Sequence, residues 1–233
     1  CDRNLDRAEK RRVEFYPAAR VFDDYRSLLA QADFEVADIA LHPVERVAAI
    51  EAALLARKHV LSQKPFVLDL EVGARLVALA AEQCVKLAVN QNGRWAPHLS
   101  YLTAAADAGI GGEIASVDVT IQWDHTWTTG TVFEDVPHLV LFDFGIHWFD
   151  FVTRLFRGRR ARRVWASVMR TSGQKMRPPI LAQAAIDYDG AQARLNFNGH
   201  VCLGQEDRTV ICGSAGTLRS FGPNLSEQTV VVH

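Results

Sequence analysis

The first 90 residues alternate between helical and extended hydrophobic patterns. Residues 4–13 are charged and helix-prone, and further helices are predicted over 23–30, 43–54 and 70–84. Short strands are predicted at 19–22, 36–41, 59–61 and 85–89. Asp23 is placed to cap the second of these helices, and Pro43 suits the first turn of the third, whose apolar face is Val44, Val47, Ile50 and Leu54. This alternation predicts a doubly wound parallel sheet with helices on both faces.

The pattern changes after residue 93. One helix at 97–108 precedes a strand at 114–123 with period-two alternation and a polar, aromatic loop at 124–137. Further strands are predicted at 163–170, 180–188, 191–198, 209–212 and 229–233, with Asp189-Gly190 as a tight hairpin turn. The second half is therefore predicted to be an α+β domain dominated by a large, mostly antiparallel open sheet.

A polar stripe interrupts the apolar segment 139–154. This segment is mostly Leu, Val and Phe, yet Asp143, His147, Asp150 and Arg154 stand at i, i+4, i+7 and i+11, on one face of a helix. Ionisable groups in apolar surroundings are costly unless they face one another, a partner or a ligand. We expect the chemistry on this stripe, with a buried polar network that only braces the domains as the alternative.

Composition narrows the class of protein. The chain has 233 residues, 48% hydrophobic and 23% charged, with a net charge of −1, which is typical of a globular protein. This balance gives no reason to expect a nucleic-acid or membrane partner, and no apolar run reaches the roughly 18–20 residues of a membrane span. The four cysteines have no metal-site or disulfide spacing, so we expect a cytoplasmic protein with reduced, mostly buried thiols.

Three motifs occur in order along the chain. Residues 59–65 (HVLSQKP) are similar to a strand that ends in Glu-Lys-Pro, and residues 90–97 (NQNGRWAP) to an Asn-x-x-Arg-aromatic-x-Pro join. Residues 143–150 (DFGIHWFD) are similar to an Asp-x-Gly-x-His-x-x-Asp helix. Together they resemble the Gfo/Idh/MocA family of glucose-fructose and inositol-type oxidoreductases, over nearly the whole chain.

The resemblance implies two domains. Residues 1–93 would be a partial dinucleotide-binding Rossmann domain and 94–233 a substrate-binding and dimerisation domain. The family begins with a glycine-rich phosphate loop, and no G-x-G-x-x-G precedes Asp2, so we expect a fragment that lacks this loop and the C-terminal end. Asp2 would be the acidic residue that accepts from the ribose hydroxyls, which favours NAD, although Arg3 beside it leaves NADP open.

The resemblance also implies roles in oxidising a secondary alcohol of a sugar, inositol or related polyol. His147 would be the base, Lys64 would hold the substrate oxygen, and Asp143 would bind a hydroxyl and orient its neighbours. Asp150 would fix the imidazole or cap the network. The implied cofactor contacts are Asp2, Arg3, His42, Pro43, Gln63, Lys64, Pro65, Asn92 and Arg94. The implied substrate contacts are Lys64, Asn92, Trp123, Asp143 and His147. The family's Lys-Pro bond is often cis, and the same is expected for Lys64–Pro65.

Departures from the family pattern keep two other functions open. Gln63 replaces the usual Glu, and Leu41-His42-Pro43 stands where the family often has Thr-Pro. These changes motivate a catalytically silent sensor of dinucleotide and sugar. A glycosidase that uses NAD transiently is the third possibility on this fold.

Three further features have competing interpretations. Residues 123–127 (WDHTW) form either a sugar-stacking wall or a loop packed by its own aromatics. The basic run 154–163 suits a solvated helix C-terminus better than a nucleic-acid site. His125, His138 and Asp143 lack a recognised ligand spacing, so no metal site is predicted. A homodimer or homotetramer, formed through the open sheet, is expected from the family.

Overall fold

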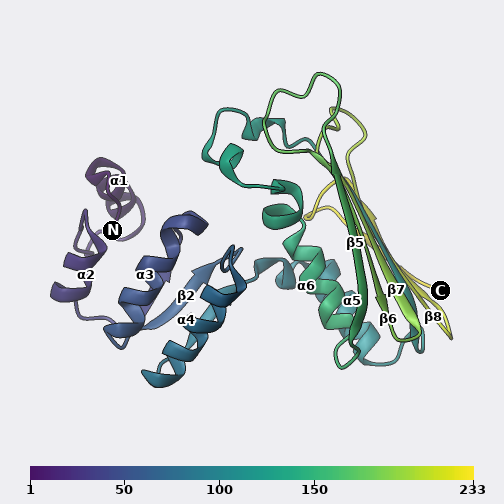
Figure 1. Ribbon diagram of the computed structural model, residues 1–233, viewed down its shortest axis with the longest axis horizontal. Helices are drawn as coiled ribbons and strands as arrows, with labels where there is room; N and C mark the ends of the chain where they lie inside the picture. The colour runs from purple at the N-terminus through teal and green to yellow at the C-terminus, as the bar shows by residue number, and fades with distance from the viewer. The chain divides into compact units, whose positions relative to one another are not determined.

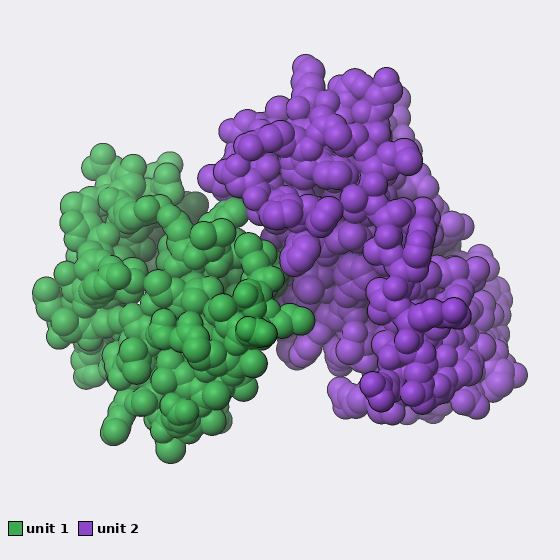
Figure 2. Space-filling view, viewed as in Figure 1, with its two compact units in different colours: residues 1–90 green, residues 91–233 purple.

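The computed structural model describes residues 1–233, which divide into two compact units, Cys1–Asn90 and Gln91–His233 (Figure 2). Each unit has a hydrophobic core of its own. Buried residues of the first unit include Ile50, Leu54 and Leu76, and those of the second include Leu102 and Trp148.

The first unit contains a three-stranded parallel sheet in the order β1-β2-β3 (Figure 1). Its elements are α1 (Leu5–Phe15), α2 (Tyr25–Gln31), β1 (Val36–Ile39), α3 (Pro43–Leu55), β2 (His59–Gln63), α4 (Leu70–Glu82) and β3 (Leu87–Asn90). The predicted parallel sheet is confirmed. Helices α3 and α4 contact each other and bury the face of β2 that carries Val60 and Ser62, whereas Leu61 on the other face is half-buried. Successive right-handed crossovers in one direction place both helices on the same face.

Three local predictions in this unit are wrong. Residues 19–22 form no strand, because the bond from the Asp2 N–H to the Phe22 carbonyl (3.1 Å) is not continued into a ladder. The side chain that caps α2 is Asp24 rather than Asp23. On α3, Ile50 and Leu54 of the predicted apolar face are buried as expected, but Val44 is 74% exposed and the charged Arg46 is buried instead.

The second unit contains a seven-stranded sheet in the order β10-β9-β8-β4-β7-β6-β5. Its strands are β4 (Ile114–Gln122), β5 (Ala161–Met169), β6 (Leu181–Tyr188), β7 (Ala191–Asn198), β8 (Glu206–Gly213), β9 (Thr217–Gly222) and β10 (Thr229–Val232). All neighbours are antiparallel except β4 and β7, which confirms a mostly antiparallel sheet. The Asp189-Gly190 turn joins β6 to β7, with Gly190 at φ 72°. Strand β9 was not expected from the sequence.

Helices cover one face of this sheet and leave the other open (Figure 1). They are α5 (Pro97–Asp107) and α6 (Ile146–Leu155), joined to shorter turns η1 (Asn92–Trp95), η2 (Thr126–Thr128), η3 (Val132–Asp135) and η4 (Val140–Phe144). Trp148 of α6 packs with Val119 of β4 and Leu195 of β7 in the core. Trp165 of β5 is 55% exposed.

Two further observations concern the chain as a whole. The cysteines are unpaired, but Cys1, Cys84 and Cys202 are exposed and Cys212 is half-buried, so the expectation of mostly buried thiols is wrong. None of the helices has the length and apolar character needed to cross a bilayer.

Candidate active site

The polar stripe does not lie on one continuous α-helix. The Gly145 N–H donates to the Val140 carbonyl (2.6 Å), five residues back, so η4 is a π-helical turn that carries Asp143. The α-helix α6 then begins at Ile146, with His147 in its first turn and Asp150 one turn later. Gly145 fits this junction because a Cβ there would lie 2.9 Å from the Val140 carbonyl. The expectation that Asp143 and His147 lie on one face of a single α-helix is therefore wrong, because a π turn stands between them.

His147 lies against the backbone of η1. A Cβ atom at Gly93 would lie 2.7 Å from His147 Nδ1 and 2.9 Å from its Cβ, so only glycine permits this approach. The Gln91 side chain donates to the Ile146 carbonyl (3.1 Å) and fixes the first turn of α6. The ring also meets Trp148 edge-on, with centroids 6.1 Å apart. The packing of η1 therefore sets where the imidazole lies.

Asp143 is buried next to a group of aromatic rings, called the aromatic wall here, which consists of Trp123, His125, Phe144 and Trp148. The adjacent Phe144 stacks on the His125 ring with centroids 3.9 Å apart, and Trp123 meets both His125 and Trp148 edge-on. Burial lowers the pKa of His125 to about 4, although the nearby Asp124 and Asp143 carboxylates oppose this shift. His125 is therefore a neutral imidazole at physiological pH.

Two residues of the 123–127 loop differ in exposure. Trp127 is 58% exposed, whereas Trp123 packs against the core of the unit. The Trp123 indole N–H is buried and donates no hydrogen bond. Of these two rings, Trp127 is accessible from solvent and Trp123 is fixed in the aromatic wall.

Asp150 forms an ion pair with Arg94. The guanidinium donates to both carboxylate oxygens, at 2.7 and 2.6 Å, which raises the pKa of Arg94. This bidentate pair ties η1 to α6. Arg94, expected to contact a cofactor, thus has a structural partner.

Lys64 lies at the carboxyl end of β2, where the Lys64–Pro65 bond is cis, as the resemblance implied. The Lys64 N–H donates to the Gln63 side-chain oxygen (2.9 Å). His42 and Pro43 begin α3 at the end of β1, and no side chain caps this helix. These segments lie at the edge of a parallel sheet where dinucleotides bind. In the first turn of α3, Pro43 has no N–H and the Glu45 and Arg46 N–H groups donate to the His42 carbonyl (3.0 Å each), which leaves the Val44 N–H for a hydroxyl or anionic acceptor. The residues present therefore fit a dinucleotide.

Arg46 was missed by the sequence analysis. It is buried on α3, and its guanidinium donates to the carbonyls of Leu41 (2.9 and 2.5 Å), Gln63 (2.7 Å) and Pro65. It therefore connects the segments that follow β1 and β2. The signal in the sequence was a single basic residue, three positions after Pro43, in a mostly apolar helix whose other charged residues are Glu45 and Glu51.

The remaining expected residues lie at the surface of their units. The Asp2 carboxylate accepts from the Asn4 N–H (2.9 Å) and lies 3.6 Å from Arg7. Arg3 pairs with Glu45 at 2.9 Å. Asn92 begins η1, next to Gly93. Nowhere in the chain do three or more His, Cys, Asp or Glu side chains come together as ligands for a metal ion.

Comparison with known proteins places both units in one family. Residues 1–91 match the family model described as "Oxidoreductase family, NAD-binding Rossmann fold", and residues 100–219 match the "GFO/IDH/MocA C-terminal domain". The chain belongs to the Gfo/Idh/MocA oxidoreductase family. The resemblance of the three motifs is thereby confirmed.

Individual Gfo/Idh/MocA relatives match most of this chain. An uncharacterized oxidoreductase of Schizosaccharomyces pombe is 25% identical over 95% of this chain and 62% of its own length. An Agrobacterium radiobacter oxidoreductase, solved with NAD+, L-tartaric acid and magnesium, has a TM-score of 0.87 at 23% identity, over 99% of this chain and 70% of that one. An Azotobacter vinelandii inositol dehydrogenase homologue, solved with NADH and myo-inositol, has a TM-score of 0.81 at 21% identity, over 100% of this chain and 68% of that one. At these identities the solved structures show the shared fold. The chain spans less than two thirds of the length of the curated relative.

Proposed function

We propose that this chain is part of an NAD-dependent oxidoreductase that acts on a secondary alcohol of a sugar, inositol or related polyol. The observation that carries the proposal is the junction of η4 and α6, where Asp143 and His147 lie in apolar surroundings on a Gfo/Idh/MocA domain. Ionisable groups kept in such surroundings are typical of a catalytic centre.

Each proposed residue has one task. NAD, when bound, accepts the hydride from the carbinol carbon. His147 takes the hydroxyl proton, because an imidazole titrates near neutral pH. Lys64 holds the same oxygen and stabilises its developing negative charge, and Asp143 binds a neighbouring hydroxyl. In the reverse direction His147 returns the proton.

The substrate class is inferred from the fold and from one neighbour. The Azotobacter vinelandii homologue was solved with NADH and myo-inositol. Trp127, which is exposed beside the aromatic wall, offers a ring on which a sugar can stack. Both observations favour a polyhydroxylated substrate.

The test is an NADH titration followed by a polyol panel, on the protein expressed from its complete reading frame. We expect saturable nicotinamide fluorescence and turnover of at least one polyol. Lys64→Met and His147→Ala should lower kcat by about 10²–10⁴-fold with NADH affinity retained. Arg162→Gln, which removes only a surface ion pair with Asp189, is the control. Near-normal turnover in both site variants would exclude the proposed roles.

A silent sensor is the second candidate. Its support is Gln63, whose side-chain oxygen accepts from the Lys64 backbone at a position where the family usually has Glu. A sensor binds NADH and a sugar without hydride transfer, so steady NADH production excludes it. Release of a free sugar without net NADH would instead indicate a glycosidase.

Cofactor choice and assembly belong to the same proposal. Arg3 pairs with Glu45, which leaves less positive charge for a 2′-phosphate and supports NAD over NADP. Comparing the affinities for NADH and NADPH tests this preference. The open sheet face, with Val164 and Trp165 exposed, supports pairing of two copies, which sedimentation of the complete protein checks.

A further inference from the structure

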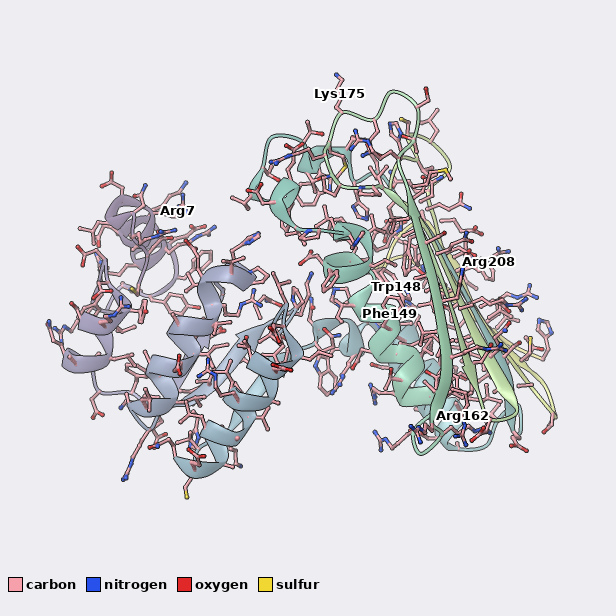
Figure 3. All side chains as sticks on the ribbon, viewed as in Figure 1. Arg7, Trp148, Phe149, Arg162, Lys175 and Arg208 are labelled. Carbon is pink, nitrogen blue, oxygen red and sulfur yellow. The ribbon has the colours of Figure 1, made fainter.

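A carboxylate is fully buried on the helix-covered face of the large sheet. Asp207 of β8 lies opposite Ile121 of β4, a core residue, and its side chain has no exposed surface. Neither of its carboxylate oxygens accepts a hydrogen bond. The next residue, Arg208, projects from the opposite face of the sheet (Figure 3). Asp207 therefore has no basic partner on its own side.

Two hydroxyl groups lie on the same face. Thr209 follows two positions along β8, and Ser220 of β9 is its direct cross-strand neighbour, so the side chains share the face of Asp207. Both are fully buried, and neither hydroxyl makes a hydrogen bond. Buried hydroxyl groups are seldom left in this state.

The loop between β9 and β10 adds two more oxygens. The Gln228 amide nitrogen donates to the Asp207 carbonyl (3.2 Å) and to the Asn224 carbonyl (2.7 Å). These bonds orient the amide so that its oxygen is the buried, unpartnered atom. Gly222 lies opposite Asp207, and a Cβ there would overlap the Glu227 carbonyl oxygen. The Glu227 carbonyl oxygen thus occupies the position that a side chain at residue 222 would take, next to the Asp207 carboxylate.

The cluster consists of oxygen atoms with one formal negative charge. A buried carboxylate without a partner costs several kcal/mol, so the arrangement calls for a positive species. Carboxylate, hydroxyl, amide and carbonyl oxygens are the ligands that hard cations prefer. A single carboxylate balances one positive charge.

We propose that Asp207, Thr209, Ser220, the Gln228 side chain and the Glu227 carbonyl bind a monovalent metal cation, Na⁺ or K⁺. The cation would join β8, β9 and the loop 223–228. Gln228 also lies in the wall of an open cavity of about 440 Å³, together with Leu225 and Ser226 of the same loop.

The test is thermal unfolding of the protein exchanged into tetramethylammonium chloride at pH 8. NaCl or KCl is then titrated in at constant ionic strength. We expect a saturable rise in Tm of about 5–10 °C at about 100 times Kd, and weaker binding at pH 5.5, where a proton competes for Asp207. Asp207→Asn should abolish the rise. Glu206→Gln, which removes the same charge from the neighbouring position, should keep it.

Three results would overturn the proposal. One is the same Tm in sodium, potassium and tetramethylammonium chloride, which would mean that Asp207 carries a proton only. Another is a full response in Asp207→Asn, and the third is saturation by Ca²⁺ or Mg²⁺ at lower concentration than either monovalent ion. Rubidium-soaked crystals of the unmodified protein provide a check without a variant, because an anomalous peak is expected at bonding distance from the Asp207 carboxylate, and its absence counts against the site.

Discussion

At the residue scale, close backbone approach and buried donors decide where the proposed chemistry sits. Gly93 lets His147 rest on η1, and Arg46 holds the carbonyls that follow β1 and β2. The role of Arg46 does not follow from its residue type, because arginine is almost never fully buried unless it is paired. Each role depends on what the rest of the chain brings to that position.

Gly93→Ala should displace the His147 ring. The added Cβ would lie 2.7 Å from Nδ1, so either the ring or η1 must move, at a cost of about 1–3 kcal/mol in unfolding free energy. We expect kcat to fall at least tenfold with NADH affinity unchanged. Gly73→Ala in α4, where the added atom meets only the Phe66 and Val67 side chains, is the control and should retain turnover. Normal turnover in Gly93→Ala would argue against His147 as the base.

Arg46→Met should destabilise the first unit. The substitution keeps the volume but leaves the carbonyls of Leu41, Gln63 and Pro65 without their donor, which costs about 3 kcal/mol in urea unfolding. Arg75→Met removes an exposed ion pair with Glu51 in the same unit and should cost less than about 1 kcal/mol. Equal losses in the two variants would contradict a structural role for Arg46.

At the element scale, the π turn η4 changes how the active-site segment is presented. A π turn widens the backbone, so Asp143 precedes α6 on a different helical register from Asp150. The short turn η1 then fixes α6 through Gln91 and Arg94. The position of the imidazole is therefore a property of two packed elements.

The Arg94–Asp150 pair should show coupling between η1 and α6. Because Asp150 is mostly buried and the pair is bidentate, a double-mutant cycle with Arg94→Gln and Asp150→Asn should give a coupling energy of about 1 kcal/mol. The coupling should fall in high salt. The exposed Arg162–Asp189 pair provides the comparison, with a coupling of less than about 0.5 kcal/mol. Zero coupling at 94–150 would mean that the pair does not fix α6.

At the scale of the whole molecule, three buried groups of the second unit have strongly shifted pKa values and contribute to the pH dependence of folding. Burial lowers the pKa of His98 and of His125 to about 4, so their contribution to stability is complete above about 6.5 and is lost as the pH falls toward 4. Asp207 acts in the opposite sense. Its pKa is raised to about 7, so its contribution is complete below about 4 and is lost as the pH rises through 7.

The unfolding free energy should therefore change with pH about as it would if a single histidine titrated. Between pH 4.5 and 6.5, in tetramethylammonium buffer, the unfolding free energy should rise by about 1 kcal/mol per pH unit, because two histidines outweigh one aspartate. Asp207→Asn should about double this slope, as measured by urea unfolding. A slope that the variant leaves unchanged would show that Asp207 does not titrate in this window.

The sequence by itself determined the order and type of most elements and the family. Local periodicity is sufficient to indicate the α/β half and most strands of the large sheet, although β9 was missed. The motifs at 59–65, 90–97 and 143–150 carry the resemblance to the Gfo/Idh/MocA family that the family models confirm. A strand such as 19–22 shows where this fails, because its pattern is extended but no neighbour completes its ladder.

Only the tertiary structure decided which polar groups are buried together. The carbonyl cradle of Arg46 and the oxygen cluster at Asp207 both arise from contacts between separate segments of the chain. Strand alternation places Asp207 and Arg208 on opposite faces, but the choice of which face the helices cover is made by packing. The local sequence pattern determines which side chains share one face of a strand, and long-range packing determines whether that face lies against helices or solvent.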